Sequence, residues 1–108
     1  MLTVTAPDVT IRGCVIRGSG SNHEGIDSGV RLLKGADRAR VMANRLIGNL
    51  YGADIHGARD ALVQGNVIEG RKDRNKNARG NGVYVWNAPG ARVVGNDIRW
   101  GRDGIFVN

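Results

Sequence analysis

The residues best suited to binding a partner or doing chemistry recur at fixed distances from three glycines. They stand two or four positions after Gly52, Gly82 or Gly104, and they are Asp54, His56, Tyr84, Trp86 and Phe106. Aromatic rings exposed on a rigid strand carry much of the energy at protein interfaces. An imidazole beside an acid can hold a metal ion or move a proton. The set therefore predicts a partner-binding face, with His56 as the candidate metal ligand.

An internal repeat indicates which elements hold these residues. Four units begin at Ala6, Ala36, Ala58 and Ala88. After each alanine, an aliphatic residue follows at position five, a small residue at position seven and a second aliphatic residue at position ten. Position eight is Cys14 in the first unit and asparagine in the others, namely Asn44, Asn66 and Asn96. Repetition on this scale is typical of solenoid proteins.

Apolar and polar residues alternate with period two in each unit, which predicts short strands and not helices. Each unit is predicted to contain two strands, the second introduced by a glycine. We therefore expect an all-β protein, a right-handed single-stranded parallel β-helix of about four turns, because parallel crossovers are right-handed. Side chains two apart share a face. The outward positions would form two columns, one of Arg31, Asp54, Tyr84 and Phe106, the other of Leu33, His56, Trp86 and Asn108.

The asparagines are predicted to form a structural ladder. Asn44, Asn66 and Asn96 would fall at one corner of successive turns. Stacked amides can hydrogen-bond along the axis there, and asparagine tolerates a left-handed bend. Cys14 occupies this column in the first turn. We expect it to be a small buried residue, with a thiolate metal ligand as the alternative.

Composition limits the classes of function. Aromatic residues are 5% of the chain and 17 residues are glycine, so we expect a thin aliphatic core. The formal charge is +6, and much of it comes from residues 71–79, within an inserted loop expected at residues 70–81. This run has no interleaved aromatic residue, so we expect a solvated loop, with a phosphate or acidic-polysaccharide site as the alternative, and no nucleic-acid partner. A polar loop at 19–28 carries His23, Glu24 and Asp27 but matches no zinc or calcium spacing.

The ends of the repeat carry no capping segment. We expect residues 1–108 to be a single β-helix segment, uncapped at both ends, of a longer protein. Free strand edges at the ends predict end-to-end self-association. The sequence shows no apolar run of membrane-spanning length and no export signal. We expect contact with a membrane only through partners. One cysteine excludes an intrachain disulfide framework.

The segments VTAPDVTIRGCVIRGSG and GNGVYVWNAPGARVVGNDIRWGRDGIFVN resemble the NosD family, periplasmic proteins needed to mature the copper-sulfide centre of nitrous oxide reductase. The likeness covers nearly all of the chain, and the linkage of VYVWNAPGARVVGN to GRDGIFVN is its specific part. It implies a periplasmic, non-enzymatic accessory module. Its implied partners are ABC transporter subunits and a copper chaperone or nitrous oxide reductase. The likeness implies no firm cofactor, and transiently bound copper is the candidate, with His56 as its candidate ligand.

Two other classes of function fit the predicted fold. A carbohydrate-binding or polysaccharide-processing β-helix is one, and its enzymes, the lyases, hydrolases and epimerases, need paired carboxylates or an acid with a positioned base. Asp54 is alone in its column, whereas Asp60 and Asp103 lie at predicted turns. A purely structural or adhesive β-helix is the other. A second column of acids would favour an enzyme, and further metal-ligand residues would favour copper-centre maturation.

Overall fold

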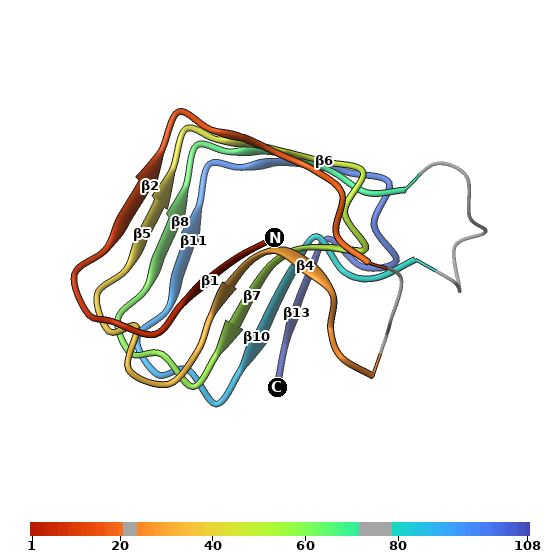
Figure 1. Cartoon of the computed structure of the whole chain (residues 1–108). Coiled ribbons are helices and arrows are strands. Elements are labelled where there is room, and N and C mark those ends of the chain that lie inside the picture. The colour runs from red at the N-terminus through yellow and green to blue at the C-terminus, as the bar shows by residue number, and fades with distance from the viewer. Residues whose placement is uncertain (21–23, 72–78) are drawn as a thin grey trace.

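The structure is a computed structural model that describes residues 1–20, 24–71 and 79–108. In these ranges the regular elements are strands, which form three parallel sheets (Figure 1). Sheet A contains β1 (Leu2–Val4), β4 (Ser28–Leu32), β7 (Tyr51–His56), β10 (Val83–Trp86) and β13 (Ile105–Val107). Sheet B contains β2 (Thr10–Arg12), β5 (Arg40–Met42), β8 (Leu62–Gln64) and β11 (Arg92–Val94). Sheet C contains β3 (Val15–Ile16), β6 (Arg45–Ile47), β9 (Val67–Glu69) and β12 (Asp97–Arg99).

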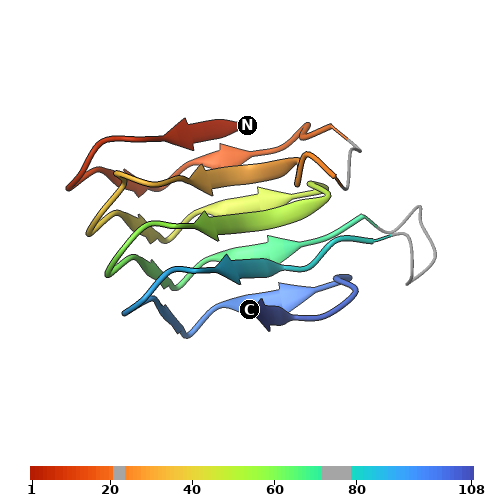
Figure 2. The ribbon, with the colours of Figure 1, turned by 90° about the horizontal axis from the view of Figure 1, so that it is seen from below.

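Successive turns of the chain lie directly on one another. Figure 2 shows the stack from the side, with the N-terminus at one end and the C-terminus at the other. In Figure 1 the chain runs clockwise as it recedes from the viewer, so the coil is right-handed. In sheet A, Val30 aligns with Ala53, and Ala53 aligns with Val83, as the repeat predicts. The predicted parallel β-helix is confirmed.

Each full turn contains three strands, not the two that the sequence predicts. A residue with positive φ divides the first half of each unit between sheets B and C, at Gly13, Ala43, Gly65 or Gly95. β1 also adds a fifth strand to sheet A, which the four-unit repeat did not indicate. One left-handed residue turns the chain sharply within a single position. The alternation of apolar residues resumes beyond it, so the sequence indicates a corner at the asparagines but not that it separates two strands.

The predicted asparagine ladder is confirmed. Asn44 Nδ2 donates to Asn66 Oδ1 at 3.1 Å, and Asn66 Nδ2 donates to Asn96 Oδ1 at 2.9 Å. The backbone N–H groups of Asn44 and Asn66 donate to the same two oxygen atoms, each at 2.9 Å. The left-handed bend is made by the residue before each asparagine, not by the asparagine itself. The ladder therefore joins neighbouring turns through both side chain and backbone.

Cys14 departs from the burial predicted for it. Its side chain is exposed. Its backbone N–H still joins the ladder, donating to Asn44 Oδ1 at 2.9 Å. The exposure follows from its position in the first turn of sheets B and C, which has a neighbouring turn on one side.

The core is a column of aliphatic side chains enclosed by the three sheets. Val41, Leu46 and Ile55 are fully buried, as the inward periodicity predicts. Burial decreases in the last turn, where Ile105 is 47% and Val107 is 71% exposed. β1 and β13 are the outer strands of sheet A. End-to-end association through these edges stays a prediction.

Ala43 is a position where glycine is expected to stabilise the fold. Its φ is 54°, and the equivalent corners have Gly13, Gly65 and Gly95. A left-handed conformation costs an L-residue about 1–2 kcal/mol, and the greater freedom of glycine in the unfolded chain offsets part of the gain. We expect Ala43→Gly to raise the free energy of unfolding by about 0.5–1 kcal/mol, as measured by urea denaturation. Ala6→Gly, exposed but without positive φ, should lower it. A change of the same sign in both variants would contradict this reasoning.

The described ends of two inserted segments lie at one corner of the coil, between sheets C and A (Figure 1). They correspond to the loops expected at residues 19–28 and 70–81. His23 and most of the basic run, residues 72–78, lie outside the described residues. No helix of the length and apolar character needed to cross a membrane occurs in the described ranges.

Candidate functional site

The outward side of sheet A brings together all five predicted site residues. The strand register aligns Arg31 with Asp54, Asp54 with Tyr84, and Tyr84 with Phe106. His56 and Trp86 align in the neighbouring column. Parallel strands in register thus convert distant sequence positions into one continuous surface. We call it the sheet A face, and it consists of Arg31, Asp54, His56, Tyr84, Trp86 and Phe106.

Ring contacts hold the aromatic side chains of this face in place. Tyr84 and Phe106 stack with centroids 5.5 Å apart and planes inclined by 8°. Tyr51, which the sequence pattern did not single out, meets Tyr84 edge to face at 5.8 Å. The rings of His56 and Trp86 stack at 4.5 Å. Trp86 and Phe106 are 38% and 40% exposed, so the face presents ordered apolar area to solvent.

Asp54 is buried, whereas the sequence pattern predicts an exposed acid. Its side chain is 0% exposed, and its Oδ2 accepts a hydrogen bond from Arg31 Nε at 3.2 Å. Burial disfavours the charged form and raises the pKa of Asp54, while the charges of His56 and Arg31 act in the opposite direction. Strand periodicity gives the direction of a side chain and not its exposure. A short side chain that points outward is covered when longer ones stand beside it.

Asp54 Oδ1 and His56 Nδ1 face each other at 3.6 Å. Both atoms are buried, and neither has a hydrogen-bond partner within the part of the chain that the structure describes. The two residues occupy alternate positions on β7, so one strand places them side by side. A carboxylate near Nδ1 favours a proton on that nitrogen and leaves Nε2 free to meet a ligand. The nearby carboxylate therefore helps to orient the imidazole of His56, whose side chain is 31% exposed.

His56 does not belong to a ready-made metal site in the described ranges. Their His, Cys, Asp and Glu side chains form no group of three or more that could hold a metal ion. An oriented imidazole fits copper as one ligand, but a stable site needs several. His56 as a copper ligand stays a prediction.

The raised pKa of Asp54 predicts how stability depends on pH. Because the folded pKa exceeds the unfolded value of about 3.9, the folded state favours the protonated carboxyl group, and this contribution is lost as pH rises through the folded pKa. Asp54→Asn cannot ionise, so its melting temperature relative to the parent chain should increase from acid to neutral pH. Asp8→Asn is the control with the opposite sign, because the Arg38 guanidinium lowers the pKa of Asp8. Its melting temperature relative to the parent chain should decrease from acid to neutral pH. A difference for Asp54→Asn that does not change with pH would contradict the prediction.

A pocket of about 530 Å³ adjoins the sheet A face where three successive turns leave β4, β7 and β10. We call it the corner pocket. Its lining includes His56 and Trp86 from the face, together with Lys34, Asp37 and Arg59 from the turns. The repeat pattern does not point to these three residues, because turn residues follow no periodic pattern. The sequence does contain one signal for this pocket: a cation follows each of two successive sheet A strands, Lys34 after β4 and Arg59 after β7.

A smaller hollow of about 350 Å³ lies beside β10 and β13, mainly toward their amino ends. Tyr51, Tyr84 and Phe106 line it together with Arg102 and Asp103. Most of the turn residues in its lining precede β10 or β13, whereas the corner pocket follows the carboxyl ends of β4, β7 and β10. The aromatic rings of the sheet A face therefore lie between two recesses.

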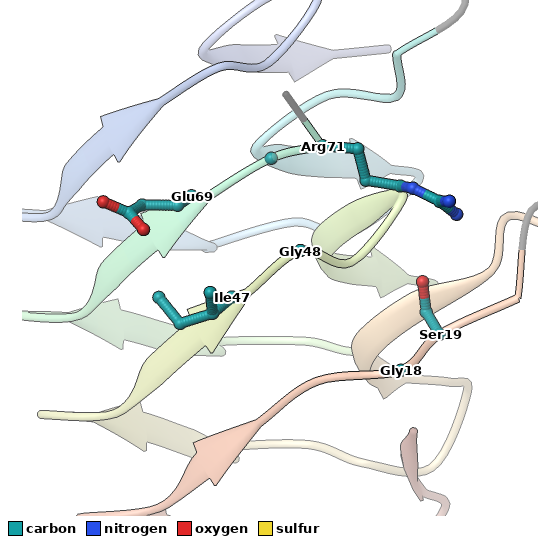
Figure 3. A pocket seen from close by; sticks show the side chains of 7 residues that line it. Gly18, Ser19, Ile47, Gly48, Glu69 and Arg71 are labelled. Carbon is teal, nitrogen blue, oxygen red and sulfur yellow. The ribbon is translucent and has the colours of Figure 1, made fainter. Parts of the chain in front are cut away.

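The hollow in Figure 3 lies at the end of sheet C, where the insertions begin. It measures about 530 Å³, and Gly18, Gly48 and Gly70 leave part of its lining without side chains. In Figure 3, Glu69 and Arg71 point in opposite directions and do not converge. This hollow therefore presents no focused set of polar groups.

The chain aligns with two curated proteins named probable ABC transporter binding protein NosD. The protein from Stutzerimonas stutzeri is 40% identical over 103 residues, which are 95% of this chain and 24% of that protein. The chain is similar to a segment of NosD. NosD from Pseudomonas aeruginosa is 34% identical over 104 residues, which are 96% of this chain and 24% of the relative. The predicted resemblance to NosD is confirmed.

The chain spans about a quarter of the length of these NosD proteins. No family model matches the chain, and no solved structure matches it. The similarity to NosD thus rests on identity along nearly the whole chain, and the fold rests on the strand geometry described above.

Proposed function

We propose that this chain is a segment of a periplasmic, non-enzymatic accessory protein that works with an ABC transporter. In its finer form, the proposal is that the protein serves maturation of the copper-sulfide centre of nitrous oxide reductase. The sheet A face would then contact a copper chaperone or the enzyme being matured. The observation that carries the proposal is 40% identity, over 95% of this chain, to a protein named as an ABC transporter binding protein.

The sheet A face has properties that suit contact with a protein. Tyr84, Trp86 and Phe106 offer large contact area with few rotatable bonds. Their ring contacts already restrict them, so binding costs less side-chain entropy than it would on a mobile surface. The paired parallel strands beneath supply a rigid base. These features support an interface more than a flexible tether.

The placement of acids supports a non-enzymatic role. Asp54 is 0% exposed and paired with Arg31, so it does not meet a ligand on the surface. Asp60 lies in the turn after β7 and Asp103 in the turn before β13, at opposite ends of parallel strands. Glycoside hydrolysis needs two carboxyl groups about 5–10 Å apart that flank one bond. These three acids do not offer that arrangement.

Copper would be the cargo of the proposed protein and not a resident cofactor of this segment. His56 supplies one oriented imidazole, and imidazole and sulfur ligands suit copper. We propose that further ligands come from the partner or from other parts of a longer chain.

Alanine variants of the face test the proposal. In the full-length protein, Tyr84→Ala and Trp86→Ala are each expected to weaken partner binding about tenfold or more while the circular dichroism spectrum stays unchanged. Binding is measured by co-purification with the transporter subunits and the copper chaperone. Assembly is measured by the absorption spectrum of the copper centre in nitrous oxide reductase.

Trp100→Ala is the matched control, because Trp100 is 46% exposed and follows β12 in sheet C. Its partner binding should remain normal. The functional assignment fails if both face variants assemble the copper centre normally, or if the control loses as much binding as they do.

A further inference from the structure

We infer that the corner pocket binds a carboxylate side chain from an acidic peptide segment of the partner. The inference rests on the proposed function, because it names the chemistry recognised at the edge of the sheet A face. Lys34 and Arg59 are exposed and line the pocket with His56. Among the described residues neither cation forms an ion pair, since the pairs present join Arg31, Arg38, His56 and Arg99 to acids. Two cations are thus available to a carboxylate.

Asp37 is the one acid in the lining of the corner pocket, and one of its two carboxylate oxygens already accepts a hydrogen bond. Asp37 Oδ1 accepts a hydrogen bond from the backbone N–H of Arg59 at 3.0 Å. This bond directs Asp37 Oδ1 toward the backbone of the turn that carries Arg59, and among the described residues no ion pair joins Asp37 to Lys34 or Arg59. The pocket therefore keeps a positive balance, which favours an anionic ligand.

The backbone fixes the walls before any ligand arrives. Arg38 N–H donates to Arg59 O at 2.8 Å, and Gly57 N–H donates to Trp86 O at 3.0 Å. These bonds join the turns that carry the cations and the aromatic wall. A pocket ordered in advance loses little entropy on binding. The rigid geometry suits one small group better than a long flexible chain.

The aromatic wall and the remaining acid decide the class of anion. Trp86 is 38% exposed and stacks on His56, so it offers apolar contact to atoms beside a charged group. Asp37 at the rim would repel a phosphate or a polyanion more than a single carboxylate, because repulsion grows with ligand charge. A glutamate or aspartate next to an apolar side chain meets both conditions. Such a segment would extend the aromatic contacts of the sheet A face.

A peptide titration tests the inference. The probe is a capped hexapeptide in which glutamate and leucine alternate, and its counterpart has glutamine in place of glutamate. Nuclear magnetic resonance should show that the glutamate peptide shifts the signals of Gly57 and the Trp86 indole, whereas the glutamine peptide does not. The combined Lys34→Gln and Arg59→Gln variant should bind about fivefold more weakly.

The combined Arg45→Gln and Arg92→Gln variant is the control, because both arginines are exposed, on β6 and β11, and the pair removes the same two positive charges. It should bind the peptide as the parent chain does. The inference is overturned if the glutamate peptide does not bind, if its shifts lie away from the corner pocket, or if the Arg45 and Arg92 control variant weakens binding equally. An equal response to both peptides would also overturn it.

The partner assay separates this inference from the proposed function. If Tyr84→Ala abolishes partner binding but the Lys34 and Arg59 variant binds the partner normally, the contact face stands and the carboxylate pocket is wrong. If the peptide binds as expected but neither set of variants affects the transporter or chaperone, the proposed function is wrong and the pocket serves another acidic partner.

Discussion

Val63→Asp is expected to unfold the chain or to lower its free energy of unfolding by about 3–5 kcal/mol. Val63 is fully buried on β8, and its strand neighbours Val41 and Val93 are also apolar. The new carboxylate would have no polar partner in the column of aliphatic side chains. Domains of this size are stable by about 5–15 kcal/mol, so the loss is a large fraction of the total. Urea denaturation followed by circular dichroism measures it.

Gln64→Asp is the matched control because Gln64 is the next residue of β8 and points to solvent. The same carboxylate there should change stability by about 0.5 kcal/mol or less. Equal losses at the two positions would refute the assignment of inward and outward faces.

Asn66→Ala is expected to cost about 3–4 kcal/mol, the largest effect among the ladder positions. Asn66 Oδ1 accepts bonds from Asn44 N–H and Asn44 Nδ2, and Asn66 Nδ2 donates to Val41 O and Asn96 Oδ1. Alanine removes all four bonds and leaves buried polar partners unsatisfied. Denaturation by urea, with the slope checked for two-state behaviour, gives the loss.

A comparison along the ladder checks the cause. Asn96 is half-buried in the last turn, so water can reach groups that Asn96→Ala leaves unpaired. Its loss of stability should be smaller than that of Asn66→Ala by about 1 kcal/mol or more. If the order is reversed, hydrogen bonding to buried partners is not what makes the ladder stabilising.

Features that recur at one position of every unit could be predicted from the sequence. Asn44, Asn66 and Asn96 share a position in the repeat, and the structure stacks them. The third strand of each turn could not be predicted, because the apolar alternation resumes directly beyond the corner at Ala43 and the equivalent glycines. The sheet A face was also predicted, since Tyr84 and Phe106 follow glycines of the same repeat position.

Side-chain burial and pockets that depend on neighbouring turns could not be predicted from the residue pattern of a single strand. The burial of Asp54 follows from longer side chains beside it, and alternation says nothing about their reach. The corner pocket depends on Lys34 and Arg59, which lie in turns where no periodicity relates them. Cys14 has the repeat position of a buried asparagine but is exposed in the first turn. The strand register could be predicted from the sequence, whereas the exposure of individual side chains required the structure.

The central claim is that the sheet A face meets a protein partner, and site-specific photo-cross-linking tests it most directly. A photoreactive p-benzoylphenylalanine is placed in the full-length protein by Tyr84→p-benzoylphenylalanine, or on sheet B by Arg92→p-benzoylphenylalanine, and irradiated with the transporter subunits and the copper chaperone present. We predict a cross-linked partner from position 84 and none from position 92. Cross-links from position 92 alone, or from neither position while the complex is intact, would contradict the claim.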